Sequence, residues 1–586
     1  MNTKAQMELS NTATRSDTKK TSVLARGLIA PLIVLLVTSI VYGAIYFRED
    51  SIPTAIGANL VPAERILKGE VPYRDFYKIQ TPGILLLNAV LFKIWGTSWI
   101  TAATGVLIFK ILTITLMFLI ARRVCSLKAA AASTTLALLW LAPGGPFRPA
   151  PIQYEMLFVM AAIYFVLRWV DSRGIVQLFA AGIAVGMIAI FKQNVGVYAA
   201  LALMISILLS ARDRTDTKET KQRADLLKAE IAATIGIAIP LTGLFIYLVS
   251  NRALAAAIDV FVHGPGEHLQ TRFTGYALPG YSSIILLAAV ICVLLASRTV
   301  QRWPRRKRLI LSLLAMAAEI CAAIAPQAAI DNSIYWFSPV LFAWAAWLYI
   351  REKRNQGDGT QHQRGILLVL LLFAVAAYGE VFPRSVRGLV IGALPPAFLL
   401  LGFVLEPNSR DPESRGGVPV TRRFALAVAT IVLMIFACRI ELPEYFSIDS
   451  QSGVRFRADT ELNFDRGRGI YLPPDRAAEV NSLVGVIQSQ VEEGGSFFAH
   501  ALDATSYYFL ADRNSPTGAT LWNDTGTNDR ERIRTMQALL EKNVRLVLTS
   551  EQAMNAEPYQ PLRDFLSNDF HSAQSIGKTI LLERNY

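Results

Sequence analysis

The sequence predicts a mainly α-helical, polytopic membrane protein with about 13 transmembrane helices and a small C-terminal α/β domain outside the cytoplasm. Three observations lead to this prediction. Hydrophobic residues make up 53% of the 586 residues and charged residues only 18%, with a mean hydropathy of +0.37. Long apolar runs alternate with short charged loops, and the composition becomes typical of a soluble protein near residue 441. Soluble domains carry about 25% charged residues, so an ordinary cytosolic enzyme is excluded.

Thirteen apolar runs are long enough to cross about 30 Å of hydrocarbon as helices. The first run follows a polar tail and has no small-residue cleavage site, so we expect a retained anchor. A shorter run, residues 82–96, contains Lys93, and we expect a juxtamembrane helix that lies in the outer interface. The thirteen runs cover residues 26–47, 99–120, 129–146, 152–170, 175–191, 194–210, 229–250, 281–298, 308–330, 333–350, 366–383, 388–405 and 424–440.

The basic residues determine the expected orientation. With residues 82–96 outside the bilayer core, the segments that face the cytoplasm hold about half of the 58 Lys and Arg residues. The N-terminus is then cytoplasmic and the C-terminal domain extracytoplasmic, in a multi-pass protein of the cytoplasmic (inner) membrane. The net charge of +13 therefore reflects topology and contact with anionic membrane lipids, and we expect no nucleic-acid partner.

The chain divides into three parts on this interpretation. Residues 1–25 form a cytoplasmic tail, residues 26–440 a membrane domain with a first outer loop at 48–98, and residues 441–586 an extracytoplasmic α/β domain. In the last part, "SFFAHA", "VRLVLTS" and "KTILLER" have the pattern of short strands, and "NDRERIRTMQALLEKN" that of an amphipathic helix. The four cysteines all precede this part and match no metal-ligand or redox spacing, so we expect no disulfide framework there.

Polar and ionisable residues gather where the expected spans meet the outer side. An ionisable residue inside a span is energetically expensive, which makes it a candidate functional residue. Convergence of such groups on one side of the membrane predicts a polar cavity that opens to the outside. The residues concerned are Glu49, Asp50, Asp75, Lys78, Gln80, Glu155, Lys192, Gln193, Glu380 and Arg384.

Some of these residues also have a simpler structural explanation. Glu49 and Asp50 are either a solvated helix end or a general base that takes a proton from an acceptor hydroxyl. Lys192 and Arg384 either extend to the interface or bind a lipid phosphate. Glu155 follows a proline-rich loop within "IQYEMLFVM", where water has less access, and this position favours a functional role.

Motifs for nucleotide or metal chemistry are missing from the sequence. No Walker loop, Rossmann glycine fingerprint or nucleophile elbow occurs in a suitable context, so chemistry driven by a cytosolic nucleotide is unsupported. His263 and His268 flank "GPGE" without an acid or cysteine cluster, which is a weak metal signal. We expect no bound metal and no cofactor, with a role for a divalent cation left open.

Several segments together resemble the GT-C class of membrane glycosyltransferases. The first span ends in acids and is followed by "AERILKGEVPYRDFYKIQTPGILLLNAVLFKIWGTSW" and by a span that ends in "ARR". "QYEML", "FKQNVGV", "FPRS" and "SYYFLADRNSPT" resemble elements of related bacterial sequences. The similarity is to the branch that uses dolichyl- or polyprenyl-phosphate sugars, which includes protein O-mannosyltransferases and aminoarabinose transferases, and it spans nearly the whole chain.

The resemblance implies transfer of one sugar from a polyprenyl-phosphate donor to an acceptor hydroxyl on the outer face, with inversion at the anomeric carbon. The acceptor is a glycan, a lipid or a protein. The carrier phosphate is the leaving group, and a Lys or Arg stabilises its developing charge. Asp50 is the first choice for the base and Glu49 the second. The expected donor-phosphate and substrate-binding residues are Lys192, Gln193, Arg384, Lys78, Asp75, Glu155 and Glu380.

Three positions depart from the family pattern, and two alternatives follow. Gln80 stands where relatives often have an acid, and Val386 and Leu389 stand where many have Asp and His. One alternative is therefore a catalytically degenerate scaffold with the same fold. The other is a multi-pass transporter, but the sequence has no clear half-length repeat, and a transporter has little need of the C-terminal domain.

Overall fold

The computed structural model describes most of the chain. The described residues are 29–49, 51–141, 149–212, 219–272, 320, 323–354, 361–382, 385–405, 420–449, 453–501, 503–517, 529–557 and 559–585.

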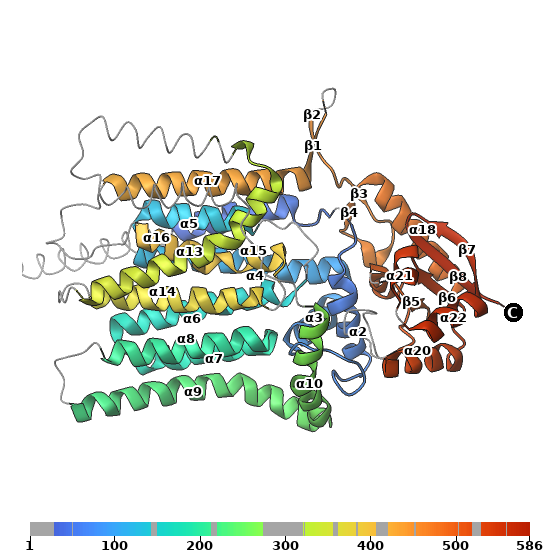
Figure 1. Ribbon diagram of the computed structural model, residues 1–586, viewed down its shortest axis with the longest axis horizontal. Coiled ribbons are helices and arrows are strands. Elements are labelled where there is room, and N and C mark those ends of the chain that lie inside the picture. The colour runs from blue at the N-terminus through green and yellow to red at the C-terminus, as the bar shows by residue number, and fades with distance from the viewer. Residues whose placement is uncertain are drawn as a thin grey trace, which may run out of the picture.

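A bundle of apolar helices runs along the long axis of the molecule (Figure 1). Local sequence determines where some of them begin: the Ser98 and Ser126 hydroxyls accept hydrogen bonds from the Thr101 and Ala129 amides and so cap two helices. The helices are Ile29–Ile45, α4 (Trp99–Val124), α5 (Leu127–Trp140), α6 (Pro151–Ser172), α7 (Ile175–Phe191), α8 (Gln193–Arg212), α9 (Glu219–Ser250), α13 (Gln327–Arg354), α14 (Gln361–Tyr378), α15 (Arg387–Gly392), α16 (Leu394–Leu405) and α17 (Val420–Tyr445).

Five helical segments in the described part are long and apolar enough to cross a membrane. They are Trp99–Val124, Gln193–Ser210, Arg223–Ser250, Ser333–Arg354 and Gln361–Val381. Seven other apolar helices in this part are shorter. The expected spans 281–298 and most of 308–330 lie outside the described residues, so the number of 13 stays a prediction.

The expected span 388–405 consists of two helices rather than one. Helix α15 ends at Gly392, and α16 begins at Leu394. Pro395 and Pro396 lie in the first turn of α16, and proline has no amide hydrogen to continue the ladder of hydrogen bonds from α15. Hydropathy does not register this break, because both halves are apolar.

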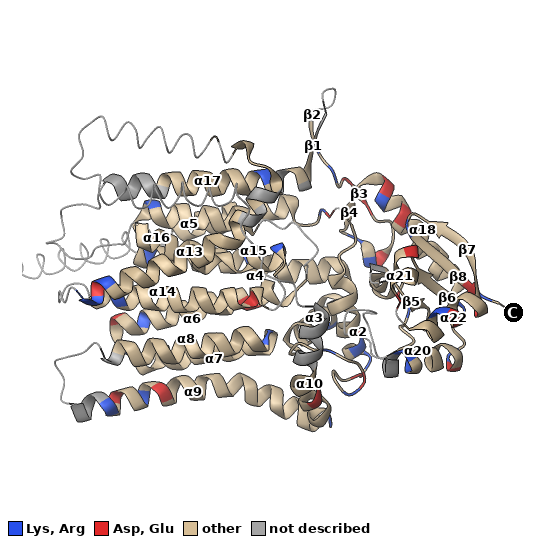
Figure 2. Ribbon diagram, viewed as in Figure 1, with Lys and Arg blue, Asp and Glu red and all other residues tan. Residues whose placement is uncertain are grey.

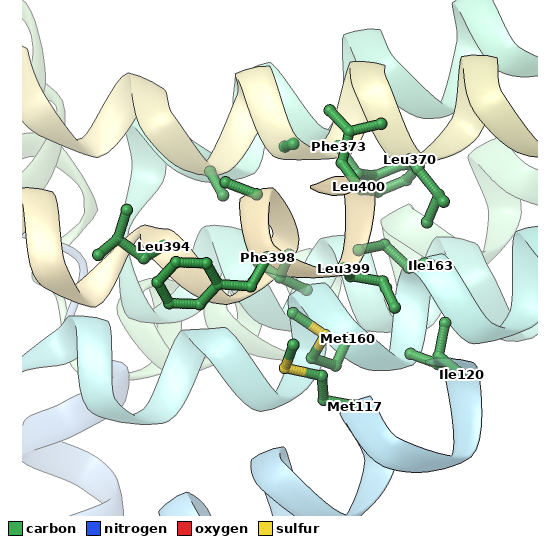
Figure 3. Close-up of a cluster of buried hydrophobic side chains, with 14 of the residues drawn as sticks. Met117, Ile120, Met160, Ile163, Leu370, Phe373, Leu394, Phe398, Leu399 and Leu400 are labelled. Carbon is green, nitrogen blue, oxygen red and sulfur yellow. The ribbon is translucent and has the colours of Figure 1, made fainter. Parts of the chain in front are cut away.

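Large apolar side chains from four helices fill the centre of the bundle (Figure 3). These side chains are almost completely buried. Their interdigitation fixes the spacing of the helices that carry the polar residues described below. They are Met117 and Ile120 of α4, Met160 and Ile163 of α6, Leu370 and Phe373 of α14, and Leu394, Phe398, Leu399 and Leu400 of α16.

Glycines allow α7 and α9 to pack at short range. A Cβ atom on Gly182 would lie 2.2 Å from the Ala233 carbonyl oxygen, and one on Gly236 would lie 2.2 Å from the Phe179 carbonyl oxygen. A side chain at either position would therefore clash with the backbone of the other helix. Small residues commonly bring helices together in this way in membranes. The hydrophobic effect does not drive helices together in lipid, so their association depends on close packing.

Charged residues collect at the ends of the bundle and beyond one end, while its middle is mostly uncharged (Figure 2). The C-terminal region, residues 446–585, lies beyond that end, which we call the capped end (Figure 1). The first loop, residues 48–98, lies there too, with η1 (Ile56–Leu60), α2 (Val61–Leu67) and α3 (Gly83–Trp95). Helix α10 (Leu254–Arg272) follows α9 at the same end.

The C-terminal region combines short strands with helices. Its four-stranded sheet has the order β5-β6-β8-β7, in which β5 and β6 are parallel and the other pairs antiparallel. Two hairpins precede it, β1 with β2 and β3 with β4. The strands are β1 (Phe446–Asp449), β2 (Gly453–Phe456), β3 (Thr460–Glu461), β4 (Tyr471–Leu472), β5 (Phe498–Ala499), β6 (Leu546–Thr549), β7 (Phe570–Ile576) and β8 (Thr579–Arg584). The helices are η6 (Asp465–Gly467), α18 (Pro474–Gln490), η7 (Asp503–Ser506), α19 (Tyr507–Leu510), α20 (Asp529–Glu541), α21 (Glu551–Ala556) and α22 (Gln560–Asp569).

The C-terminal region and the first loop share one apolar core with the capped end. Ile56 of η1, Phe92 of α3, Trp99 of α4 and Phe509 of α19 all belong to the same buried cluster. The rings of Phe92 and Phe509 are stacked with centroids 5.8 Å apart. The first loop is therefore packed between the helices and the C-terminal region, with little freedom to move separately from either.

Helix α3 has the two faces expected of an interfacial helix. Ile84, Leu85 and Phe92 are buried, whereas Ile94 and Trp95 are 62% and 61% exposed. Exposed apolar residues of this size suit contact with lipid. Its position in a membrane interface remains a prediction.

Candidate functional site

Three ionisable residues from different helices meet at the capped end. Glu155 lies in the second turn of α6, Lys192 lies between α7 and α8, and Glu380 lies in η4 (Gly379–Val381), directly after α14. The Lys192 ammonium donates a hydrogen bond to Glu380 Oε1 and forms an ion pair with it. Glu155 lies within electrostatic range of both partners. The structure thus brings together three of the residues that the sequence placed at one end of the bundle.

This cluster is almost sealed from water. Glu155 is 1% exposed and Glu380 2%, and the Lys192 side chain is 15% exposed. The Oε2 atoms of Glu155 and Glu380 have no hydrogen-bond partner among the described residues. Buried carboxylate oxygens normally accept hydrogen bonds, so these atoms have capacity to bind a ligand that carries donors.

Gln193 ties this cluster to the first loop. Its Nε2 donates to the Ile79 carbonyl oxygen at 2.9 Å, and its Oε1 accepts from the Thr81 amide at 3.2 Å. The Thr81 hydroxyl donates to the Ala189 carbonyl oxygen at 2.9 Å. Gln193 therefore holds the loop segment that follows Lys78 against the turn between α7 and α8. It has this structural role and is also the neighbour of Lys192 in the sequence.

Lys78 is buried beside η1 at 9% exposure. Its ammonium donates to the Ala58 carbonyl oxygen at 3.0 Å and to Asn59 Oδ1 at 2.9 Å. Asn59 Nδ2 donates in turn to the Pro149 carbonyl oxygen, two residues before α6 begins. The π-helical turn η1 orients Asn59 between the loop and α6, and such turns are frequent at functional sites. Lys78 thus belongs to the same end of the bundle as Glu155.

The acids that end the first helix are only partly described. Glu49 is buried at 5% exposure, and its amide donates to the Tyr471 carbonyl oxygen of β4 at 2.9 Å. Asp50, the first choice for the base, and Arg384, an expected phosphate ligand, lie outside the described residues. Their roles stay predictions.

Asp75 has a local structural role in the first loop. Its carboxylate accepts from the Val71 amide at 2.7 Å and from both Arg74 Nε and Nη2. The hydrogen bonds from Arg74 lower the pKa of the Asp75 carboxyl below its usual value. This loop packs on the corner between α9 and α10, where Val71 and Tyr73 belong to one buried apolar cluster with Ala253. The described contacts of Asp75 do not include Glu155, Lys192 or Glu380.

Two buried polar residues, Asn59 and Lys110, were missed in the sequence. Asn59 carries no charge and lies in an apolar stretch, so no simple pattern marks it. Lys110 had a clear signal, since it is a charged residue in the middle of an expected span. Its ammonium donates to the Leu141 carbonyl oxygen at the end of α5 at 3.1 Å and lies near the ring faces of Tyr42 and Tyr46. Lys110 therefore supplies a hydrogen-bond donor to a carbonyl oxygen at the C-terminal end of α5, inside the bundle.

The described part of the chain contains no group of three or more His, Cys, Asp or Glu residues able to hold a metal ion. His263 pairs with Asp259 on α10, and the side chain of His268 lies outside this part. The expected absence of a metal and of a cofactor remains a prediction.

Comparison with known proteins finds one kind of similarity. No protein-family model and no curated protein matches the chain. Among solved structures, it is similar to a crystal structure of ArnT from Cupriavidus metallidurans bound to undecaprenyl phosphate. The match has 14% sequence identity and a TM-score of 0.42, and it covers 96% of this chain and 98% of that chain. Similarity at this level does not assign the chain to a family.

Proposed function

We propose that the chain is an integral-membrane glycosyltransferase that moves a single sugar from a polyprenyl-phosphate donor to an acceptor hydroxyl on the outer face of the cytoplasmic membrane. The observation that carries the proposal is the buried cluster of Glu155, Lys192 and Glu380 at the capped end, joined through Gln193 to the loop that bears Lys78. Buried acids and lysines gathered at one end of a bundle with a mostly uncharged middle suit a substrate with a lipid tail, a phosphate and a polyhydroxylated sugar.

The charge balance within the cluster distinguishes the roles of its members. Lys192 is already paired with Glu380, so most of its charge is balanced before a phosphate arrives. Sugar hydroxyls donate hydrogen bonds, and the unpartnered Oε2 atoms of the two acids are suited to accept them. We therefore assign Glu155 and Glu380 to the sugar, and Lys78, whose ammonium donates to two uncharged oxygens, to the donor phosphate, with Arg384 as a further candidate.

The proposed chemistry is a single displacement. Asp50 or Glu49 accepts the proton of the acceptor hydroxyl while its oxygen attacks the anomeric carbon. The bond between that carbon and the phosphate oxygen breaks, and its electron pair leaves with the polyprenyl phosphate. A lysine ammonium stabilises the charge that develops on this leaving group. Attack opposite to the leaving group inverts the anomeric carbon, and no nucleotide is consumed.

The proposal is tested by replacing the acids one at a time in the full-length protein in membrane vesicles. The assay measures sugar transfer from a set of labelled polyprenyl-phosphate sugars. Removing a general base lowers the rate by a factor of about 10²–10⁴, so we expect a loss of this size in Asp50→Asn or in Glu49→Gln. We expect Glu155→Gln to raise the donor KM more than it lowers kcat. Lys128→Met changes an exposed lysine in α5 and is the matched control.

The same vesicles separate the two alternative functions. Undiminished transfer in both Asp50→Asn and Glu49→Gln would remove the assignment of the base. Absence of transfer from every donor, with solute flux across the vesicle membrane, would favour a transporter. Donor binding without transfer would favour a catalytically degenerate scaffold.

A further inference from the structure

Backbone hydrogen bonds join the end of the first helix to the C-terminal region. Tyr471 of β4 forms a bridge with Arg48. The Tyr471 amide donates to the Phe47 carbonyl oxygen at 3.0 Å, and the Glu49 amide donates to the Tyr471 carbonyl oxygen at 2.9 Å. These two hydrogen bonds lie on either side of Arg48, so they fix the path of the backbone from Phe47 to Glu49.

The side chain of Arg48 adds a second attachment at the same place. Its guanidinium donates to the Ala458 carbonyl oxygen at 2.5 Å. It also lies 3.7 Å from the centroid of the Phe456 ring and 5.2 Å from that of Tyr471. A planar guanidinium stacks on aromatic faces and is attracted to them when it is partly removed from water. Arg48 is therefore clamped by three residues that follow it by more than 400 positions in the sequence.

Other contacts dock the first loop independently of this clamp. Arg466 binds both carboxylate oxygens of Glu64 in α2, at 2.6 and 3.1 Å. The Ser506 hydroxyl donates to the Pro53 carbonyl oxygen at 3.1 Å. Because these contacts are separate, loss of the Arg48 side chain is expected to release the segment around Glu49 without undocking the whole loop.

We propose that Arg48 is a positioning residue of the sugar-transfer site, through which the C-terminal region holds the acidic end of the first helix. This inference rests on the proposed function, because the held residues include Glu49, one of the two candidate bases. Glu49 is nearly buried, so a small change in the path of the backbone changes the groups that its carboxylate faces. Displacing a catalytic group by about 1 Å lowers the rate by a factor of about 10². Through the clamp, the C-terminal region contributes to catalysis indirectly, by positioning Glu49.

Two measurements on Arg48→Met test the proposal in the full-length protein in lipid nanodiscs. Hydrogen exchange of the amides in residues 47–52 reports the clamp, and we expect exchange to become faster by about tenfold. The kcat and the donor KM for a labelled polyprenyl-phosphate sugar report the positioning, and we expect kcat to fall by about tenfold with KM unchanged. Arg48→Lys retains the charge over the ring and should recover part of both effects.

Arg513→Met is the matched control. Arg513 also binds carbonyl oxygens, those of Val491 at 2.7 Å and Ala511 at 3.1 Å, but these partners all lie within the C-terminal region. We expect this variant to leave exchange at residues 47–52 and kcat unchanged.

The outcomes distinguish failure of the inference from failure of the proposed function. Unchanged exchange in Arg48→Met would overturn the clamp. Faster exchange with an unchanged kcat would overturn the positioning role and leave the transfer reaction intact. Absence of transfer by the unmodified protein from any donor would overturn the proposed function and the positioning role with it, while the exchange measurement still decides whether the clamp exists.

Discussion

The pair formed by Lys192 and Glu380 makes a prediction that can be worked through in energetic terms. Lys192→Met keeps the length of the side chain and removes its charge, which leaves the carboxylates of Glu155 and Glu380 buried without that cation. Removing one partner of a buried ion pair costs about 3–5 kcal/mol. The Glu380 side chain is 1% exposed and that of Lys192 15%, so screening by solvent reduces this value little. We expect the free energy of unfolding to fall by about 3 kcal/mol or more.

Glu380→Gln should cost less, since Lys192 still has Glu155 as a neighbour. We expect a loss of about 1–2 kcal/mol, the range for disturbing a buried hydrogen bond. In the double variant, the second substitution removes a group that the first has already left unpaired. The loss of unfolding free energy in the double variant should therefore be about 2 kcal/mol smaller than the sum of the two single losses.

The assay is reversible unfolding of the purified protein in mixed micelles, by titration with SDS and circular dichroism. Lys128→Met, at an exposed position, should stay within about 0.5 kcal/mol of the unmodified protein. Additivity of the Lys192 and Glu380 effects to within about 0.5 kcal/mol would refute the reasoning, because it would mean that the two side chains act independently.

Two further predictions concern the first loop. A Cβ atom on Gly83 would lie 2.6 Å from the Ile190 carbonyl oxygen, so Gly83→Ala should push α3 from α7 and lower the free energy of unfolding by about 1–3 kcal/mol. A Cβ atom on Gly43 would have nothing within 4 Å, so Gly43→Ala should be tolerated in the same micelle assay. The pKa of Asp75 is lowered by hydrogen bonds from Arg74, so its contribution to stability is present above the usual aspartate pKa and lost as the pH falls through the lowered value. The stability difference between the unmodified protein and Asp75→Asn should therefore shrink on acidification from pH 7, and a difference that grows would contradict this assignment.

Hydropathy predicted several of the helical segments, because a run of apolar residues is a local property of the sequence. The expected run at 99–120, for example, corresponds to Trp99–Val124. The break between α15 and α16 was missed because both halves are apolar. The relevant signal was Pro395 followed by Pro396, which interrupts backbone hydrogen bonding without changing hydropathy.

The individual roles of the polar residues depended on packing that no local pattern contains. Sequence position alone placed Glu155, Lys192 and Glu380 at one end of the bundle, where the structure brings them together. The same argument grouped Asp75 with them, although its described partners are Arg74 and a loop amide. The attachment of residue 48 to β2 and β4 joins segments far apart in the chain, so only the folded structure reveals it.

The most direct test of the account is a transfer reaction with the unmodified protein reconstituted in lipid vesicles. The measurement follows a labelled polyprenyl-phosphate sugar and quantifies the transferred sugar, the released polyprenyl phosphate and the anomeric configuration of the product. The account predicts release of one polyprenyl phosphate for each sugar transferred, with an inverted anomeric centre and no requirement for a nucleotide. Sugar transfer that requires a nucleotide sugar, or a product with retained configuration, would contradict it.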